Sequence, residues 1–404
     1  MNVLYLTFYY EPDLCAGSFR NTPLIRELAS QLQMNDTIHV VTTQPNRYQS
    51  FKQIALPYQE WQCESGARVR IDRVAVPAHA SGLTDQIRSF WSYYRAARQL
   101  TKTESYDLVV ASSSRLFTAF VGAQLARRQK RPLFLDIRDL FRETILEMFG
   151  KSVLPIVLNP ALRLVEQYTF GYATHINLVS EGFRSYFDPY RQATFSYFTN
   201  GIDEEFLNLP VSAPRNSGRK TILYAGNIGE GQGLHKLIPE AARLLADQYR
   251  FVIIGDGGAK KKLEEAIRSN KVTNVELRTP VNRTTLLDAY QSADYLLVHL
   301  NDLEAFRRVL PSKLFEYGAT DKPILAGVAG YAAQFVRTYI DNHILFDPGD
   351  VTSLVVQLNT TPYRTCCRTR FVEQFQRKTI VKALAKQMLK TAAYPINHAD
   401  APAL

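Results

Sequence analysis

The segment RRVLPSKLFEYG, residues 307–318, places Lys313 and Glu316 three residues apart just after Pro311, in a stretch whose apolar residues Leu310, Leu314 and Phe315 look buried. Pro311 and Ser312 form a plausible helix start, so Lys313 is predicted to lie in the first helical turn, beside the positive end of the helix dipole. A cation is unfavourable at this position unless an anion joins it. A salt bridge between Lys313 and Glu316, which share one helix face, is the alternative, but it explains only Glu316. The segment therefore indicates an anionic ligand.

Glycine-containing loops form a second group of candidate sites. The loop GNIGEGQG, Gly226–Gly233, follows a strand-like run and precedes a helical pattern, so its backbone amides can meet a phosphate. The loop FYYEPDLCAGSFR, with Gly17 and Arg20, is the corresponding feature of the first half, and VIIGDGG follows a further strand-like run. Each of the three loops has a plain structural alternative, which is a tight turn or a surface loop.

Arg138 and Asp139 directly follow the strand-like run PLFLDI. Doubly wound folds hold their ligands at the carboxyl ends of the strands, so this pair is a candidate for chemistry, with an exposed ion pair as the alternative. The chain has no Asp-x-Asp motif, and its four cysteines have neither CxxC spacing nor histidines at metal-ligand distances. We expect no metal, no other cofactor and reduced thiols.

The elements that must position these residues alternate between strand and helix patterns. NVLYL and TILYA each precede a glycine-containing loop and a helical pattern, and further short apolar runs follow in both halves. Such alternation predicts an α/β fold of parallel sheets with helices on both faces. Because the chain has 404 residues, more than a single core sustains, we predict two Rossmann-like domains that face each other across a cleft.

The predicted domain boundaries follow the composition. Residues 209–220, LPVSAPRNSGRK, are rich in Pro, Ser, Gly and Arg and lack periodicity, which indicates a linker. We therefore predict an N-terminal domain at 1–208, a C-terminal domain at 221–370, and a C-terminal helix with a frayed tail at 371–404.

Charge and hydropathy limit the partners. The formal net charge of +10 favours anionic ligands such as phosphates, nucleic acid or acidic lipid. The N-terminus lacks the pattern of a signal peptide, and no apolar stretch reaches the roughly 20 residues that span a bilayer. The segments RSFWSYYRAAR, ARRQKRP and LEMFGKSVLPIVL favour peripheral association with an acidic membrane, whereas core helices with solvated basic ends are the alternative.

The order of these motifs along nearly the whole chain resembles the retaining GT-B glycosyltransferases of glycosyltransferase family 4, and PSKLFEY resembles their bacterial surface-polysaccharide branch. The motifs that carry the resemblance are VLYLTFYYEPDLCAGSFR, LDIRDLF, LVSEGF, TNGID, YAGNIGEGQGL, VIIGDGG, SADYLLVHL and LPSKLFEYGA. The resemblance implies transfer of a sugar, with retention of configuration, from a nucleotide sugar to a lipid-linked glycan. We expect the donor nucleotide to be UDP in preference to GDP. We also expect the enzyme to act at the cytoplasmic face of the membrane.

The resemblance also implies roles for individual residues. Lys313 would meet the donor pyrophosphate together with the glycine loop, Glu316 would bind the ribose hydroxyls, and Arg278 would flank the base. The implied catalytic residues are Asp139, Arg138 and Lys313. The implied donor-binding residues are Gly17, Arg20, Asn227, Gly229, Gln232, Gly233, Arg278, Arg308, Ser312, Lys313, Leu314 and Glu316.

Two regions depart from the family pattern. Arg308 stands where many members have a glutamate that contacts the donor sugar. It is a candidate contact to a carboxylate or other acceptor group on that sugar, with a solvated loop arginine as the alternative. Asn227 and Gln232 occupy the region where many members have an Arg and a Lys, which leaves more charge neutralisation to Lys313 and Arg20.

The sequence leaves two alternative functions open. Sugar-nucleotide 2-epimerases share the GT-B architecture, so architecture alone does not decide the reaction. A basic nucleic-acid-binding protein would require clustered Lys and Arg with interleaved aromatic residues and a known module. RSFWSYYRAAR is the nearest candidate, and no such module is visible.

Overall fold

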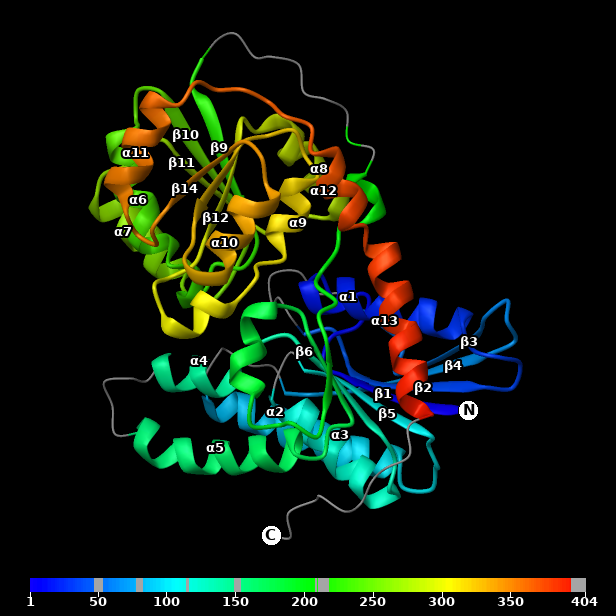
Figure 1. Cartoon of the computed structure of the whole chain (residues 1–404). Coiled ribbons are helices and arrows are strands. Elements are labelled where there is room, and N and C mark those ends of the chain that lie inside the picture. Colours follow the sequence, from blue (N-terminus) through cyan, green and yellow to red (C-terminus); the bar gives the residue numbers. More distant parts are fainter. Residues whose placement is uncertain are drawn as a thin grey trace. The chain divides into compact units, whose positions relative to one another are not determined.

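The computed structural model describes residues 1–46, 54–77, 83–113, 116–148, 154–207, 209 and 218–393. These residues form two compact α/β units (Figure 1). The first unit comprises Met1–Thr199 with Lys378–Leu404, and the second comprises Asn200–Arg377. Each unit holds a mainly parallel sheet with helices on both faces, which confirms the predicted α/β fold of two Rossmann-like domains.

The unit boundaries differ from the predicted domain boundaries. Residues 210–217 of the predicted linker 209–220, and residues 394–404 of the predicted tail, lie outside the described residues. The second unit begins before that linker, because the Ile202 backbone N–H donates to the Phe375 carbonyl at 2.8 Å. Because Phe375 takes part in the same contact, the second unit continues to Arg377, past the predicted domain end at residue 370.

The first unit is built on an eight-stranded sheet in the order β3-β4-β2-β1-β5-β6-β7-β8. Its edge pair β3–β4 is antiparallel and the other neighbouring strands are parallel. The strands are β1 (Asn2–Thr7), β2 (Thr37–Thr43), β3 (Tyr58–Gln62), β4 (Arg68–Val74), β5 (Leu108–Ser113), β6 (Leu133–Ile137), β7 (His175–Leu178) and β8 (Thr194–Ser196). The helices are α1 (Ala16–Ser30), α2 (Leu83–Leu100), α3 (Leu116–Gln129), α4 (Phe141–Met148), α5 (Leu154–Phe170), the 3₁₀ helix η1 (Glu181–Phe187) and α13 (Arg377–Ala392).

The C-terminal helix α13 packs beside α1 on the sheet of the first unit (Figure 1). Its apolar residues recur at spacings of three or four, which gathers them on one helix face. That face joins the buried cluster formed by α1 and strands β1, β2, β4, β5 and β6. The residues contributed by α13 are Val381, Leu384, Ala385 and Met388. The sequence predicts this helix, and the structure adds that it completes the core of the first unit.

The second unit is built on a six-stranded parallel sheet in the order β11-β10-β9-β12-β13-β14. The strands are β9 (Lys220–Ala225), β10 (Tyr249–Ile254), β11 (Val275–Arg278), β12 (Tyr295–His299), β13 (Ile324–Gly327) and β14 (His343–Phe346). The α-helices are α6 (Leu234–Leu244), α7 (Lys260–Ser269), α8 (Arg283–Ser292), α9 (Lys313–Gly318), α10 (Gly330–Tyr339), α11 (Val351–Thr360) and α12 (Thr369–Gln374). The 3₁₀ helices are η2 (Glu204–Phe206), η3 (Glu230–Gln232) and η4 (Glu304–Arg308).

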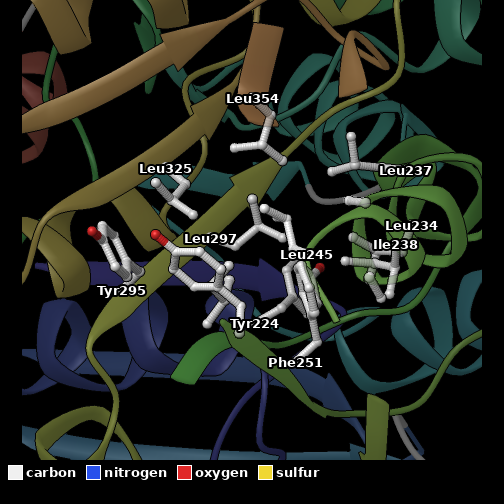
Figure 2. Close-up of a cluster of buried hydrophobic side chains, with 14 of the residues drawn as sticks. Tyr224, Leu234, Leu237, Ile238, Leu245, Phe251, Tyr295, Leu297, Leu325 and Leu354 are labelled. Atoms are coloured by element: carbon white, nitrogen blue, oxygen red, sulfur yellow. The ribbon is translucent and has the colours of Figure 1, made fainter. Parts of the chain in front are cut away.

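The core of the second unit lies between its sheet and the helices α6, α7 and α11. Figure 2 shows Leu234, Leu237 and Ile238 of α6 gathered with Phe251 and Leu297 of the sheet. These side chains are fully buried or nearly so. The apolar contact fixes α6, and therefore the glycine loop that leads into it, against the sheet.

Both sheets reverse the direction of winding beside their first strand. Strand β1 lies between β2 and β5, and β9 lies between β10 and β12. At such a reversal, the connections that leave two adjacent strands run to opposite faces of the sheet. Open α/β sheets bind their ligands at the carboxyl ends of these two strands. The fold therefore positions the loop after β1, and the Gly226–Gly233 loop after β9, at the ligand-binding edge of their own units.

Candidate functional site

The glycine loop of the second unit is held by the loop that follows β10. Gly226 donates its backbone N–H to the Ile254 carbonyl at 2.8 Å. Gly255 has a φ of +154°, and a Cβ at this position would lie 1.9 Å from the Gly226 carbonyl oxygen. The two backbones therefore approach more closely than any side chain at residue 255 allows. This close approach gives VIIGDGG a structural role as the support of the glycine loop.

Gly255→Ala is expected to reduce the free energy of unfolding by about 2 to 3 kcal/mol, because it adds a backbone clash to an unfavourable φ. Gly349→Ala is the matched control. Gly349 also has a positive φ, +80°, but a Cβ there would meet no atom within 4 Å. The control should cost only about 1 to 2 kcal/mol. Urea unfolding of both variants measures the difference, and equal losses would contradict the close contact.

Hydrogen bonds within the glycine loop fix its shape. The Gln232 side-chain oxygen accepts from the Asn227 amide at 2.8 Å and from the Gly229 backbone N–H at 3.1 Å. Gly233 adopts a left-handed φ of +59° where η3 ends and α6 begins. The resemblance described above implies that all four residues, Asn227, Gly229, Gln232 and Gly233, bind the nucleotide sugar. The structure brings them together in one loop, in which the Gln232 oxygen bonds to Asn227 and Gly229.

A buried histidine connects the glycine loop to the loop before α11. His299, the last residue of β12, is 1% exposed. Its Nε2 accepts from the Gly349 backbone N–H at 2.9 Å, so its Nδ1 carries the proton and donates to the Gln232 carbonyl at 2.6 Å. Burial lowers the pKa of His299, which keeps the ring neutral and this tautomer in place.

Lys313 is brought to the glycine loop by α9. The helix begins at Lys313, directly after Pro311 and Ser312, which confirms the predicted helix start. The Lys313 Nζ lies 5.0 Å from the centre of the Tyr224 ring. A Cβ at Gly226 would lie 2.3 Å from the same nitrogen. The ammonium group therefore lies against the first glycine of the loop, where a phosphate bound by the loop would meet it.

Glu316 lies one turn further along α9 and has two partners. Tyr290 donates its hydroxyl to Glu316 Oε2 at 2.8 Å, and Arg283 Nη1 lies 3.5 Å from Glu316 Oε1. Arg283 also forms an ion pair with Asp203. The Glu316 side chain retains 16% exposure. The carboxylate is therefore held in one orientation and remains accessible to a ligand.

The other predicted donor-binding residues of the second unit differ in exposure. Arg278 pairs with Glu276, two residues earlier on β11, at 2.7 Å and 3.0 Å, and both side chains are exposed. Arg308 ends η4 and is half-buried, as is Ser312. Leu314 is fully buried, so its side chain belongs to the core and cannot contact a donor.

Arg20 has a structural role, which corrects the prediction that it binds the donor. It is fully buried and forms a bidentate ion pair with Asp136 at 2.8 Å and 2.9 Å. Its guanidinium also donates to the carbonyls of Phe198 and Thr199. Burial on its own would raise the pKa of the Asp136 carboxyl, but Arg20 and Asn177 outweigh burial and hold that pKa below its ordinary value. Arg20 thus ties α1 to β6 and is not available to a phosphate.

Arg138 and Asp139 follow β6 at its carboxyl end, as the sequence predicts. Arg138 is only 9% exposed, so the alternative of an exposed ion pair is wrong for this residue. A Cβ at Gly17 would lie 3.1 Å from Arg138 Nη1, which brings this predicted donor-binding glycine and the guanidinium together. Asp139 is exposed. The first unit therefore presents a carboxylate and a buried cation at the same strand end.

Two further observations bear on cofactors and membranes. Across the described ranges, no three His, Cys, Asp or Glu side chains come together as a metal site would need. In the part of the chain that the structure describes, no helix combines the length and apolar character needed to cross a bilayer. None of the four cysteines, all of which the structure describes, forms a disulfide.

Two family models match the chain, one in each unit. The model described as glycosyl transferase 4-like domain matches residues 22–192, and the model described as glycosyl transferases group 1 matches residues 207–361. The chain carries two glycosyl transferase domains. The group 1 domain contains the glycine loop, Lys313 and Glu316, and the 4-like domain contains Arg138 and Asp139.

Known proteins resemble the chain in part of its sequence and in its fold. A stretch of 155 residues is 31% identical to the putative colanic acid biosynthesis glycosyl transferase WcaI of Escherichia coli, and it covers 38% of this chain and 37% of WcaI. The structure resembles a sucrose-phosphate synthase of Thermosynechococcus elongatus, with a TM-score of 0.74 and 13% identity over 96% of this chain and 98% of the other. It also resembles Anabaena HepE in complex with UDP-glucose, with a TM-score of 0.60 and 14% identity over 97% of both chains. These structural likenesses establish the GT-B fold of the two glycosyl transferase domains.

The structure adds residues to the candidate site that sequence reasoning missed. Tyr290 and Arg283 orient Glu316, and His299 supports the glycine loop. His299 had a usable signal, because a polar residue ends the apolar run YLLVH at the ligand-binding edge. Tyr290 and Arg283 had none, because they lie within an ordinary helical pattern and meet Glu316 only in the fold.

Proposed function

We propose that the protein is a glycosyltransferase that moves a sugar from a nucleotide-sugar donor, with retention of configuration. The observation that carries this proposal is the Lys313 ammonium beside Gly226 of the glycine loop, within a group 1 glycosyl transferase domain. A cation and loop amides at one strand end suit the diphosphate of a nucleotide sugar. Glu316, which keeps an accessible carboxylate, suits the ribose hydroxyls.

The proposed donor is a UDP-sugar. HepE, which has a similar fold, was crystallised with UDP-glucose, and this supports a uridine nucleotide over a guanosine nucleotide. Arg278 lies at the end of β11 and would flank the base. Its pairing with Glu276 raises the pKa of the guanidinium and keeps the arginine charged.

The chemistry proposed for the second unit is stabilisation of the leaving diphosphate. Cleavage of the bond between the sugar and the diphosphate leaves negative charge on the diphosphate and positive charge on the sugar ring. Lys313 and the amides of the glycine loop would stabilise that negative charge without a catalytic metal. In the first unit, Asp139 is the proposed catalytic carboxylate.

The proposed acceptor is a lipid-linked glycan of surface-polysaccharide synthesis. The name of WcaI, which states colanic acid biosynthesis, supports an acceptor of this class. The acceptor would bind in the first unit, since the second holds the features suited to the donor.

The function is tested by incubating the purified full chain with UDP-, GDP- and dTDP-sugars. We expect a UDP-sugar to bind and to be consumed when a lipid-linked acceptor is present. Incubation without acceptor distinguishes a glycosyltransferase from a 2-epimerase, because only the epimerase would convert the UDP-sugar when no acceptor is present. Folded protein that neither binds nor consumes any of these sugar nucleotides would overturn the proposal.

Asp139→Asn is expected to lower kcat more than about tenfold while leaving the melting temperature nearly unchanged. The residue is exposed at the end of β6, so its carboxylate contributes little to packing. The substitution keeps the shape of the side chain and removes its charge. Steady-state kinetics and thermal unfolding measure both effects. Unchanged turnover would remove Asp139 from the reaction.

A peripheral membrane surface on α2 is part of the proposal. Ile87 and Trp91 are 43% and 50% exposed, and Arg88 and Arg95 are exposed on the same helix. This combination of apolar and basic side chains suits an acidic membrane surface. Of the other two candidate segments, ARRQKRP ends α3, and residues 149–153 of LEMFGKSVLPIVL lie outside the described residues.

Arg88→Glu combined with Arg95→Glu is expected to weaken binding to acidic liposomes severalfold per charge, since each basic residue contributes about 1 kcal/mol near such a surface. Flotation with phosphatidylserine vesicles at low salt measures the bound fraction. Arg268→Glu, at an exposed position of α7, is the matched control and should bind like the unmodified protein. Protein that stays unbound at low salt would contradict a membrane role.

A further inference from the structure

The guanidinium of Arg138 is buried without an acceptor for two of its nitrogens. Arg138 is 9% exposed, and its Nε and Nη1 have no hydrogen-bond partner among the described residues. A buried charged donor without a partner loses its hydration and gains nothing in exchange, which is costly. Such a group in a folded protein indicates a missing partner such as an ion or a substrate.

The first turn of α1 lies against this guanidinium. A Cβ at Gly17, the second residue of the helix, would lie 3.1 Å from Arg138 Nη1. The N–H groups of a first turn have no acceptor within the helix. The N-cap residue Cys15 provides no side-chain cap, and the first turn contains no acidic residue. Two positive features, the helix end and the guanidinium, are therefore adjacent.

The nearby carboxylates do not satisfy these donors. Both oxygens of Asp136 accept from Arg20 at 2.8 Å and 2.9 Å. Asp139 attracts the Arg138 charge but is itself exposed. Burial, and then the positive charge of Arg20, lower the pKa of the Arg138 guanidinium. The surroundings thus disfavour the charged arginine unless an anion is present.

We propose that Arg138 and the first turn of α1 bind an oxyanion, a phosphate or a carboxylate, that is carried by a substrate of the enzyme. Only the assignment of the anion to a substrate rests on the proposed function; the site itself rests on Arg138 and α1. The phosphate of a lipid-linked acceptor and the carboxylate of an acidic sugar share the required chemistry. Because Gly17 has no side chain, nothing on this residue lies between the amides of the first turn and the guanidinium, so one oxyanion could contact both.

The test measures the affinity of inorganic phosphate and of glucuronate for the full chain by calorimetric titration. The reference protein is Lys313→Met, because this change removes the cation of the second unit that would also attract phosphate. Adding Arg138→Met to this reference should weaken binding of the preferred anion about tenfold or more. Adding Gly17→Ala, which keeps the arginine and fills the space beside it, should weaken binding in the same direction.

The preferred anion identifies the source. Tighter binding of phosphate would assign the site to a phosphorylated acceptor, and tighter binding of glucuronate would assign it to a sugar carboxylate. Binding that is equal in all three proteins would mean an adventitious ion only and would overturn the inference. The absence of measurable binding to the reference protein would overturn it as well.

Thermal unfolding separates an anion site from a structural role. Arg138→Met should leave the melting temperature in buffer without phosphate or carboxylate unchanged or higher, since the Nε and Nη1 of Arg138 have no hydrogen bond to lose. A fall of several degrees in that buffer would show that the guanidinium has a structural partner and would overturn the inference. Anion binding requires no turnover, so a failure of glycosyl transfer would leave this result standing. Intact transfer with no anion effect would overturn this inference alone.

Discussion

Lys313→Met is expected to weaken UDP binding by roughly 10- to 150-fold and to leave uridine binding unchanged. The range corresponds to hydrogen bonds with a charged group, which are worth about 1.5 to 3 kcal/mol. The Lys313 ammonium lies beside Gly226 at the start of the glycine loop, where it would meet the diphosphate and not the nucleoside. Calorimetric titration with both ligands measures the effect.

Glu316→Gln is the matched variant for this experiment, because it alters the same short helix one turn further on. The substitution keeps the shape of the side chain and its contact with Tyr290, but it removes the charge that faces Arg283. If Glu316 binds the ribose, uridine and UDP should lose affinity equally. A loss of uridine affinity in Lys313→Met would contradict the assignment of the ammonium to the diphosphate.

Arg20→Met is expected to reduce the free energy of unfolding by about 3 to 5 kcal/mol, because it leaves the buried carboxylate of Asp136 without its ion-pair partner. Both side chains are almost completely buried, at 1% and 0% exposure. Urea unfolding monitored by circular dichroism measures the loss. UDP affinity of the folded variant should stay unchanged, since Arg20 is committed to contacts within the first unit.

Arg26→Met is the control for Arg20→Met, because it breaks an ion pair of the same helix that lies at the surface. Arg26 and Glu11 are 61% and 36% exposed. Exposed pairs of this kind contribute about 0 to 1 kcal/mol, so the control should be nearly as stable as the unmodified protein. Equal losses in the two variants would contradict the structural role of Arg20.

Features that depend on local pattern could be predicted from the sequence. The alternation of apolar runs and helical periodicity predicted the two parallel sheets, except for the antiparallel edge pair β3–β4, and Pro311 with Ser312 predicted the start of α9. The position of Arg138 and Asp139 after β6 was predicted in the same way. These predictions succeeded because strand ends and helix starts are encoded within a few residues.

Features that depend on distant partners could not be predicted. Arg20 looked like a phosphate ligand, yet its carboxylate partner Asp136 lies 116 positions away in the sequence. The same holds for Glu316, which receives its hydrogen bond from Tyr290, 26 positions earlier. Sequence spacing gives no information on such contacts, because they are created by the arrangement of the sheet. The roles of buried charges were therefore the least predictable part of the site.

The return of the chain to the first unit through α13 sets the order in which a newly made protein can fold. Leu384 and Met388 belong to the core of the first unit, whereas the second unit is one continuous segment, Asn200–Arg377. Ribosomes add residues from the N-terminus at about 5–20 per second, and domains usually fold in that order. Here the first unit cannot close its core until the last helix has left the ribosome. Its sheet therefore exposes an apolar face during synthesis, while the second unit is already able to fold.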